Sequence, residues 1–273
     1  MSRLLQDLRR FGVYLSLSSI LEPSSHIAIS ANEREEAREI QVSLLPSASL
    51  ETPVCEVGFR FSPFAEVGGD FADFFHLSNG QIGIYVGDVV GKGLSAAMYA
   101  ALVMGMLRGI HKTGENTASA LTILNERLLQ RPVPGRYAAT LYAVFDPQSL
   151  RLNFSNAGLP YPLLVSASGC SVLGNGGLPS GLLPGSSYET HSVQMSPGNS
   201  VLFATDGLHE LRDSQSNDFT WEKLRETWRQ CWNKSAKESL DFLFQEANRF
   251  SGDGHHDDDI TAVVLKVAER SRP

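Results

Sequence analysis

Four short motifs place acidic residues at the end of an apolar stretch or beside a glycine turn, where proteins seldom leave a charge unpaired. They lie at residues 67–73, 87–93, 204–207 and 255–261. Carboxylates gathered at one place repel one another, so a cluster is stable near neutral pH only if protons or cations neutralise it. Oxygen ligands without a supporting set of His and Cys suit Mg²⁺ or Mn²⁺. Two such ions that share a carboxylate can hold a nucleophilic water and clamp a phosphate.

The spacing around these motifs predicts which carboxylates face one another. Asp88 continues the alternating row of Ile82, Ile84 and Val86, so we expect it on the core-facing side of a strand. Asp206 ends one apolar run, and Asp258 precedes the last one. If those two runs are antiparallel neighbours, both carboxylates emerge at the same edge of a sheet.

The elements that must position these residues are strands interrupted by two pairs of helices. Runs rich in Val, Leu, Ile and Phe predict strands at residues 57–61, 82–88, 141–145, 150–154, 200–204 and 260–267. Apolar periodicity predicts helices at residues 94–112, at 117–130, at 220–232 and after Ser235. Short turns between consecutive strands imply antiparallel pairing, so the pattern predicts a layered α+β domain.

Composition limits the class of protein further. The chain has 273 residues, with 23 basic and 30 acidic side chains and a net charge of −7. The absence of a Lys/Arg run argues against a nucleic-acid partner. Three widely spaced cysteines indicate a reducing, cytoplasmic location. The apolar stretch at residues 11–21 is too short to span a bilayer, and no small-residue cleavage site follows it, so we expect neither a membrane segment nor a signal peptide.

The order of the motifs is more specific than any one of them. Ile-Gln-Val-Ser-Leu-Leu-Pro at 40–46 is followed by Val-Gly-Gly-Asp-Phe at 67–71 and by Gly-Asp-Val-Val-Gly-Lys-Gly at 87–93. Ala-Thr-Asp-Gly-Leu-His-Glu at 204–210 and Asp-Asp-Ile-Thr at 258–261 complete the series. Over residues 38–268 the chain resembles the PPM-type, metal-dependent serine/threonine phosphatases of the SpoIIE/RsbU-like bacterial branch. It departs from that branch at Val90, Leu159 and Ser180, which puts substrate choice in doubt more than reaction type.

The resemblance implies an antiparallel β-sandwich flanked by helices, with two Mn²⁺ or Mg²⁺ ions at one end. Asp88 would be central and bridge both ions, and the main-chain carbonyl of Val89 would complete one of the two coordination shells. Asp206 and Asp258 would hold the opposite ion, and Asp70 would support the first. The nucleophile would be a metal-bound water, so no side chain forms a covalent intermediate. The residues expected to support these ligands from behind are Asp73, Gly207 and Asp259.

The implied substrate is a phosphoserine or phosphothreonine on a STAS-domain anti-sigma factor antagonist, which would make the chain a protein phosphatase in a partner-switching pathway. Two other functions remain open. The same fold could act as a metal-poor binding or adaptor module, or as a two-metal hydrolase of small phosphate esters.

The residues before the phosphatase-like part differ in composition. The segment from Asn32 to Leu45 is rich in helix formers, and Pro46 ends it. We expect residues 1–38 to form a helical segment for regulation or homodimerisation, residues 39–268 to form the phosphatase domain, and residues 269–273 to form a tail.

Overall fold

A computed structural model describes residues 31–113, 116–252 and 256–269. The chain divides into two units, Met1–Arg34 and Glu35–Pro273. Most of the predicted N-terminal segment, residues 1–30, lies outside the described residues, as do residues 270–273 of the predicted tail. The second unit contains all four acidic motifs, and of their residues only His255 lies outside the described part.

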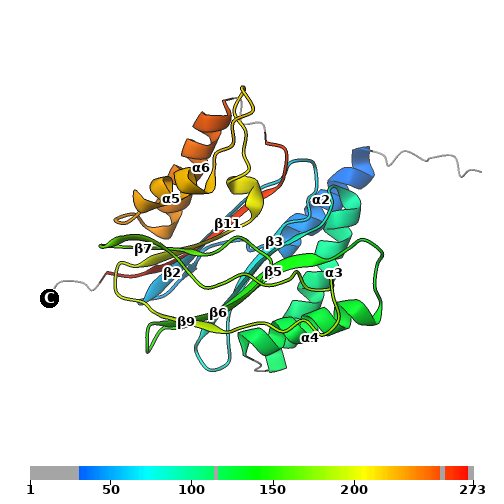
Figure 1. The fold of residues 1–273 in the computed structure, drawn as a ribbon, viewed down its shortest axis with the longest axis horizontal. Coiled ribbons are helices and arrows are strands. Elements are labelled where there is room, and N and C mark those ends of the chain that lie inside the picture. The colour runs from blue at the N-terminus through cyan, green and yellow to red at the C-terminus, as the bar shows by residue number, and fades with distance from the viewer. Residues whose placement is uncertain (1–30, 114–115, 253–255, 270–273) are drawn as a thin grey trace, which may run out of the picture. The chain divides into compact units, whose positions relative to one another are not determined.

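Two antiparallel sheets form the centre of this unit (Figure 1). Neighbouring strands of the first sheet are, in order, β1 (Leu50–Glu51), β2 (Cys55–Ser62), β11 (Ile260–Val267), β10 (Ser200–Ala204), β7 (Leu163–Ser166) and β8 (Gly169–Val172). Those of the second sheet are β3 (Phe71–His76), β4 (Ile82–Val89), β5 (Ala138–Asp146), β6 (Arg151–Ala157) and β9 (His191–Gln194).

The alternation of side chains along the strands builds the core between the two sheets. Ile82, Ile84 and Val86 of β4 are fully buried there, and they meet residues from the other sheet. The residues they meet include Val201, Phe203, Val263 and Leu265. The predicted core-facing row that ends at Asp88 therefore points into the space between the sheets.

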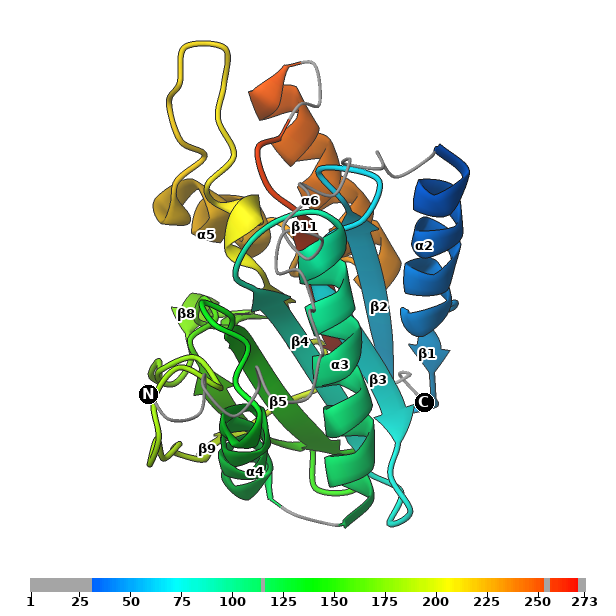
Figure 2. The same cartoon turned by 90° about the vertical axis from the view of Figure 1, so that its right-hand side faces the viewer.

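Helices cover both outer faces of the sandwich (Figure 1). Helices α3 (Leu94–Ile110) and α4 (Thr117–Gln130) lie on the second sheet, and Figure 2 shows them beside each other against it. Helices α5 (Trp221–Arg229) and α6 (Ala236–Ser251) lie on the first sheet. The side chain of Trp228, a residue of α5, is fully buried against this sheet, and its indole N–H donates to the carbonyl of Leu163 in β7 at 3.0 Å.

Local sequence explains where these helices begin. Ser235 and Glu238 form a complete capping box at the start of α6, and the Asn116 side chain accepts from the backbone N–H of Ser119 at the start of α4. Helix α3 has no side-chain cap. It follows Gly93, whose positive φ of 69° allows the sharp turn between the end of β4 and the helix.

The predicted antiparallel β-sandwich flanked by helices is confirmed. The predicted helix at 94–112 ends at Ile110 and continues as a 3₁₀ turn at His111–Thr113, and the helix predicted at 220–232 is α5, Trp221–Arg229. Strands β1, β3, β7, β8 and β9 were not predicted. Four of them have only two to four residues, which is too short for an alternating pattern to stand out.

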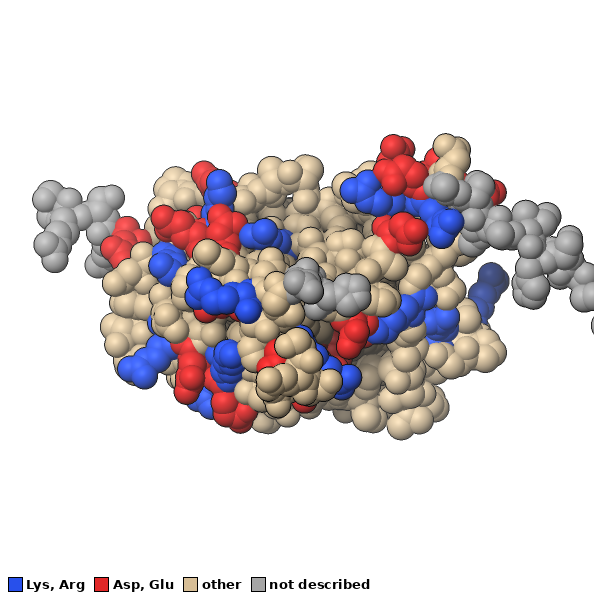
Figure 3. Space-filling view, turned by 90° about the horizontal axis from the view of Figure 1, so that it is seen from above, with Lys and Arg blue, Asp and Glu red and all other residues tan. Residues whose placement is uncertain are grey.

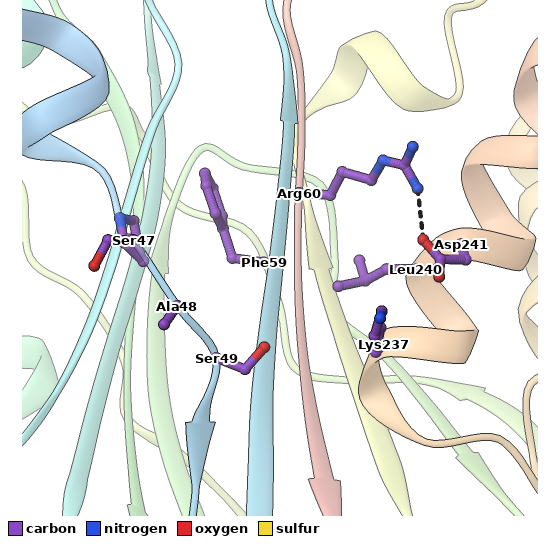
Figure 4. A pocket seen from close by; sticks show the side chains of 9 residues that line it. Ser47, Ala48, Ser49, Phe59, Arg60, Lys237, Leu240 and Asp241 are labelled. Atoms are coloured by element: carbon purple, nitrogen blue, oxygen red, sulfur yellow. Dashed lines mark hydrogen bonds and ion pairs between the residues drawn. The ribbon is translucent and has the colours of Figure 1, made fainter. Parts of the chain in front are cut away.

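The surface of this unit shows no single-sign charge field on the face that carries α5 and α6, where basic and acidic side chains are interspersed (Figure 3). A shallow pocket of about 390 Å³ lies between residues 46–49, β2 and α6 (Figure 4). Arg60, which lines this pocket, forms an ion pair with Asp241 at 2.8 Å. None of the metal ligands expected from the sequence lines the pocket. Within the described part of the chain, no helix is both long enough and apolar enough to cross a bilayer.

Candidate metal centre

The two terminal strands of the motif series bring Asp206 and Asp258 to one edge. Strands β10 and β11 are antiparallel neighbours, with Ala204 opposite Ala262. Asp206, after β10, and Asp258, before β11, therefore lie at the same edge of the sheet. Beyond the last pair, the backbone N–H of Thr205 donates to the carbonyl of Thr261 at 3.0 Å. The end of β10 and the start of β11 are thereby held together where the acidic loops begin.

Asp88 lies at the end of β4, beside these loops. Burial, followed by the negative charges of Asp206, Asp258 and Asp259, raises the pKa of its carboxyl group to about 7. A carboxyl group with such a pKa needs a proton or a cation near neutral pH. The structure therefore brings together the three carboxylates that the sequence singled out as principal ligands.

Asp70 joins the same group from the loop before β3. It is almost fully buried, and burial followed by the charges of Asp88 and Asp259 raises the pKa of its carboxyl group. The hydroxyl of Thr205 donates to Asp70 Oδ2 at 2.8 Å. This bond fixes one carboxylate oxygen and leaves the side chain beside Asp88.

Glycine at position 69 lets the backbone of this loop approach Asp88. A Cβ atom added there would lie 2.8 Å from the carbonyl oxygen of Val89 and 3.3 Å from Asp88 Oδ1. Both contacts are tighter than ordinary Cβ contacts, so a larger residue would displace the two oxygens. Gly69 thus leaves room for the Val89 carbonyl and the Asp88 carboxylate on the same side of the loop.

Asp259, which lies just before β11, is bonded to the loop between β2 and β3. It is only 5% exposed, and its two carboxylate oxygens accept from the backbone N–H groups of Gly69 at 2.6 Å and Phe64 at 2.9 Å. Gly207 packs against it so closely that an added Cβ would lie 2.0 Å from its carbonyl oxygen. Both residues therefore determine how the loops around Asp88 fit together.

Asp258 is neutralised by a lysine from the Asp88 motif. Lys92 Nζ lies 3.0 Å from Asp258 Oδ2, donates to the carbonyl of Asp257, and stands 5.0 Å from the centre of the Phe64 ring. The pair is about half exposed. It holds the 87–93 turn against the loop that precedes β11.

Asp73 lies in a different set of contacts. Its Oδ2 accepts from the Tyr85 hydroxyl at 3.0 Å and from Arg108 Nε at 2.9 Å. Arg108 also donates through Nη2 to the carbonyl of Leu44, at the end of helix α2 (Ala31–Leu44), at 2.6 Å. Among the described contacts, Asp73 therefore connects β3, α3 and α2 and does not touch Asp88.

The donor chemistry of this group fits a hard divalent cation, because it consists of carboxylate and carbonyl oxygens. In the part of the chain that the structure describes, no three His, Cys, Asp or Glu side chains are already grouped to hold an ion. The present partners account for this: Asp258 is paired with Lys92, and Asp259 is bonded to backbone N–H groups. Binding an ion would require at least the first pair to open.

Gln41 is a residue of this region that the sequence analysis missed. It lies on α2, is 8% exposed, and exchanges two hydrogen bonds with Gly68: Nε2 donates to the carbonyl at 2.7 Å, and Oε1 accepts from the N–H at 3.0 Å. Its neighbours Ile40 and Val42 are 63% and 54% exposed. Since Gln41 and buried Leu45 are one helical turn apart, the inward face of α2 carries a polar residue, which is the signal that could have revealed it.

Comparisons with known proteins agree with this geometry. The family model described as Stage II sporulation protein E (SpoIIE) matches residues 78–268. The chain belongs to the SpoIIE family. This confirms the resemblance to PPM-type phosphatases of the SpoIIE/RsbU-like branch.

Individual relatives share the family at low identity. Protein IcfG of Synechocystis sp. is 26% identical over 85% of this chain and 41% of its own length. The phosphoserine phosphatase RsbU of Bacillus subtilis is 22% identical over 86% of this chain and 70% of its own length. The solved SiaA-PP2C domain of Pseudomonas aeruginosa superposes with a TM-score of 0.76 at 18% identity, covering 86% of this chain and 95% of that domain. The chain thus spans less than half of IcfG but nearly all of the SiaA domain.

Proposed function

We propose that this SpoIIE-family chain is a metal-dependent phosphatase that hydrolyses phosphoserine or phosphothreonine on a protein. The observation that carries the proposal is the partly buried Asp88 carboxylate, whose pKa is raised to about 7 by burial and by neighbouring carboxylates at one end of the sandwich. A group in this state is suited to bind cations. The name of RsbU, a phosphoserine phosphatase, supports the choice of substrate.

We assign the ligand roles as the resemblance implies. Asp88 would bridge two Mn²⁺ or Mg²⁺ ions, with the Val89 carbonyl and Asp70 on one side and Asp206 and Asp258 on the other. When bound, the ions would activate water and neutralise phosphate charge. Asp73, Gly207 and Asp259 would support these ligands from behind.

The chain's own residues prepare that site. Thr205 fixes one oxygen of Asp70, and Asp259 holds the backbone of Gly69 in place. Gly69 in turn leaves space for the Val89 carbonyl. Such support fixes ligand orientation, so its loss would weaken metal binding without removing a ligand.

We extend the proposal to the substrate named by the resemblance, a STAS-type anti-sigma factor antagonist in a partner-switching pathway in the cytoplasm. The three cysteines of the chain are free in the structure, as expected for a reducing compartment. The alternatives are an adaptor without activity and a hydrolase of small phosphate esters.

The test compares three substrates with the purified chain and added Mn²⁺: an aryl phosphate, a set of sugar phosphates, and phosphoserine proteins that include a phosphorylated STAS domain. We expect the phosphoprotein to give the highest kcat/KM. Hydrolysis of sugar phosphates with equal or higher kcat/KM would favour the small-ester hydrolase, and no turnover of any substrate would favour the adaptor.

We further propose that residues 1–38 regulate or dimerise the phosphatase domain of residues 39–268, with residues 269–273 as a tail. Two contacts from the second half of α2 support this proposal. Gln41 bonds to Gly68 next to the acidic loop, and the Leu44 carbonyl accepts from Arg108 of α3. A change in α2 would therefore reach both the loop before Asp70 and a helix that covers the sandwich.

Replacing Gln41 by alanine is expected to lower kcat at least fivefold and to weaken Mn²⁺ binding, because two hydrogen bonds to Gly68 are lost. Each such bond contributes about 1 kcal/mol to stability. Titration calorimetry and steady-state assays measure both effects. Ser43→Ala is the matched control, since the Ser43 hydroxyl bonds only to Ile40 within the same exposed helix face among the described contacts.

A truncated chain that begins at Glu39 tests the role of the preceding residues. We expect a lower mass by light scattering or an altered turnover. Unchanged mass, metal affinity and turnover would contradict a regulatory or dimerising segment.

A further inference from the structure

An open groove of about 470 Å³ lies next to Asp206. Three segments far apart in the chain line it: residues 158–161 after β6, residues 176–177 after β8, and the first residue of α5. Asp206 and His209 complete the lining. We call this feature the Asp206 groove.

Two aromatic side chains line the groove. Tyr161 is 44% exposed, which is unusual for a large aromatic residue in this chain. Trp221 is partly buried, and the ring of His209 meets its ring edge-on at 5.5 Å. Tyr161 and Trp221 also line a narrow crevice together with Leu202, so the two rings lie near each other.

The backbone part of the groove is fixed before any ligand arrives. The Asn156 side chain accepts from the N–H of Leu159 and donates to its carbonyl, both at 2.9 Å, which sets the turn before Tyr161. A Cβ on Gly177 would lie 2.6 Å from the Asn156 carbonyl, so glycine is needed for this close approach. A preformed groove costs little ordering on binding.

The chemistry of the lining favours an uncharged, partly apolar ligand. Among the described lining residues there is no Lys or Arg, so the groove has no cation of its own for a phosphate. It offers aromatic faces and glycine backbone, and Asp206 and His209 are the polar side chains at its edge. Apolar walls with a few polar groups are typical of recognition sites.

We propose that the Asp206 groove binds the stretch of the protein substrate next to its phosphorylated residue, with a bulky apolar side chain seated between Tyr161 and Trp221. The proposal rests on the function proposed above, because it takes Asp206 as one end of the site that receives the phosphate. A polypeptide suits the groove because the groove is open and has Asp206 in its lining, so a residue next to the phosphorylated one can reach it. Because the groove is not lined by Lys or Arg, we expect the phosphate to bind at the acidic centre and the neighbouring residue of the substrate to bind in the groove.

The test uses phosphoserine peptides that carry Leu, Phe or Gly at each position from three before to three after the phosphoserine, together with an aryl phosphate. For the wild-type chain we expect at least one position where Leu or Phe gives at least tenfold higher kcat/KM than Gly. Tyr161→Ala is expected to reduce that ratio to below threefold while aryl phosphate hydrolysis stays within twofold. Tyr161→Phe should keep the preference.

Met98→Ala is the control, because Met98 is an exposed apolar residue, 68% exposed against 44% for Tyr161, on α3 and outside the groove. The proposal is overturned if no position shows a preference, or if Tyr161→Ala keeps it. A loss of activity on aryl phosphate in the wild-type chain would instead contradict the proposed phosphatase function itself. Equal losses on all substrates in Tyr161→Ala would show a structural role for Tyr161 and also overturn the proposal.

Discussion

Asp88→Asn is expected to lower kcat/KM on aryl phosphate and phosphoprotein by about 1,000-fold or more, which corresponds to about 4 kcal/mol of transition-state stabilisation. The physical reason is that Asp88 would share its charge between two ions, and asparagine supplies no charge. Asp73→Asn should cost much less, because Asp73 bonds to Arg108 and Tyr85 instead of Asp88. Steady-state kinetics and calorimetric Mn²⁺ titration of both variants measure the difference.

Equal losses in the two variants would contradict the assigned roles. Thermal unfolding of the metal-free proteins is the control that shows whether the Asp88 variant is folded. The ordinary pKa of an aspartate is 3.8, and in the folded chain burial and neighbouring carboxylates raise that of Asp88 to about 7. A raised pKa means that the contribution of Asp88 to stability is present below pH 3.8 and is lost as the pH rises through about 7. Metal-free Asp88→Asn should therefore be at least as heat-stable as metal-free wild type at pH 8.

Removing divalent metal is expected to abolish activity, with a residual rate below about one thousandth of the original, because the proposed nucleophile is a water that the ions would activate. Mn²⁺ or Mg²⁺ added after chelation should restore it. Metal should also raise the melting temperature, because an ion that binds only the folded state stabilises it. Activity and thermal unfolding are measured on the same chelated sample.

The wild-type chain after exhaustive chelation is compared with the same sample dialysed against buffer alone. Full hydrolysis by the chelated sample would contradict metal dependence. An unchanged melting temperature upon addition of Mn²⁺ to metal-free protein would contradict binding at a site that is formed in the folded state.

The strands that carry the acidic motifs could be predicted because their patterns are local. Ile82, Ile84 and Val86 alternate strictly and lead to Asp88. The shared edge of Asp206 and Asp258 followed from one assumption, that β10 and β11 are antiparallel neighbours. The capping box of Ser235 and Glu238 likewise marks the start of α6 within four residues. In each case the information lies within one element, where side-chain period and backbone geometry are directly linked.

The remaining contacts could not be predicted because they join segments that are far apart in the chain. The Lys92–Asp258 pair, the Gln41–Gly68 bonds and the Arg108–Asp73 pair each depend on how separate loops and helices meet. A lone Lys in a glycine turn or a lone Gln on a charged helix has no local pattern that names its partner. Strands β7, β8 and β9 pose the same problem, since a strand of four residues is defined by its neighbours in the sheet.

The position of the tryptophans has a practical consequence for spectroscopy. The chain has three, and Trp221, Trp228 and Trp232 all lie in or just after α5, on one outer face of the sandwich. Fluorescence excited selectively from tryptophan therefore reports on this layer, and unfolding confined to α3 and α4 would leave that emission unchanged. Trp228 is fully buried and should emit at short wavelength, whereas Trp221 borders the Asp206 groove. Quenching by a bound peptide would thus read out the groove without any attached dye.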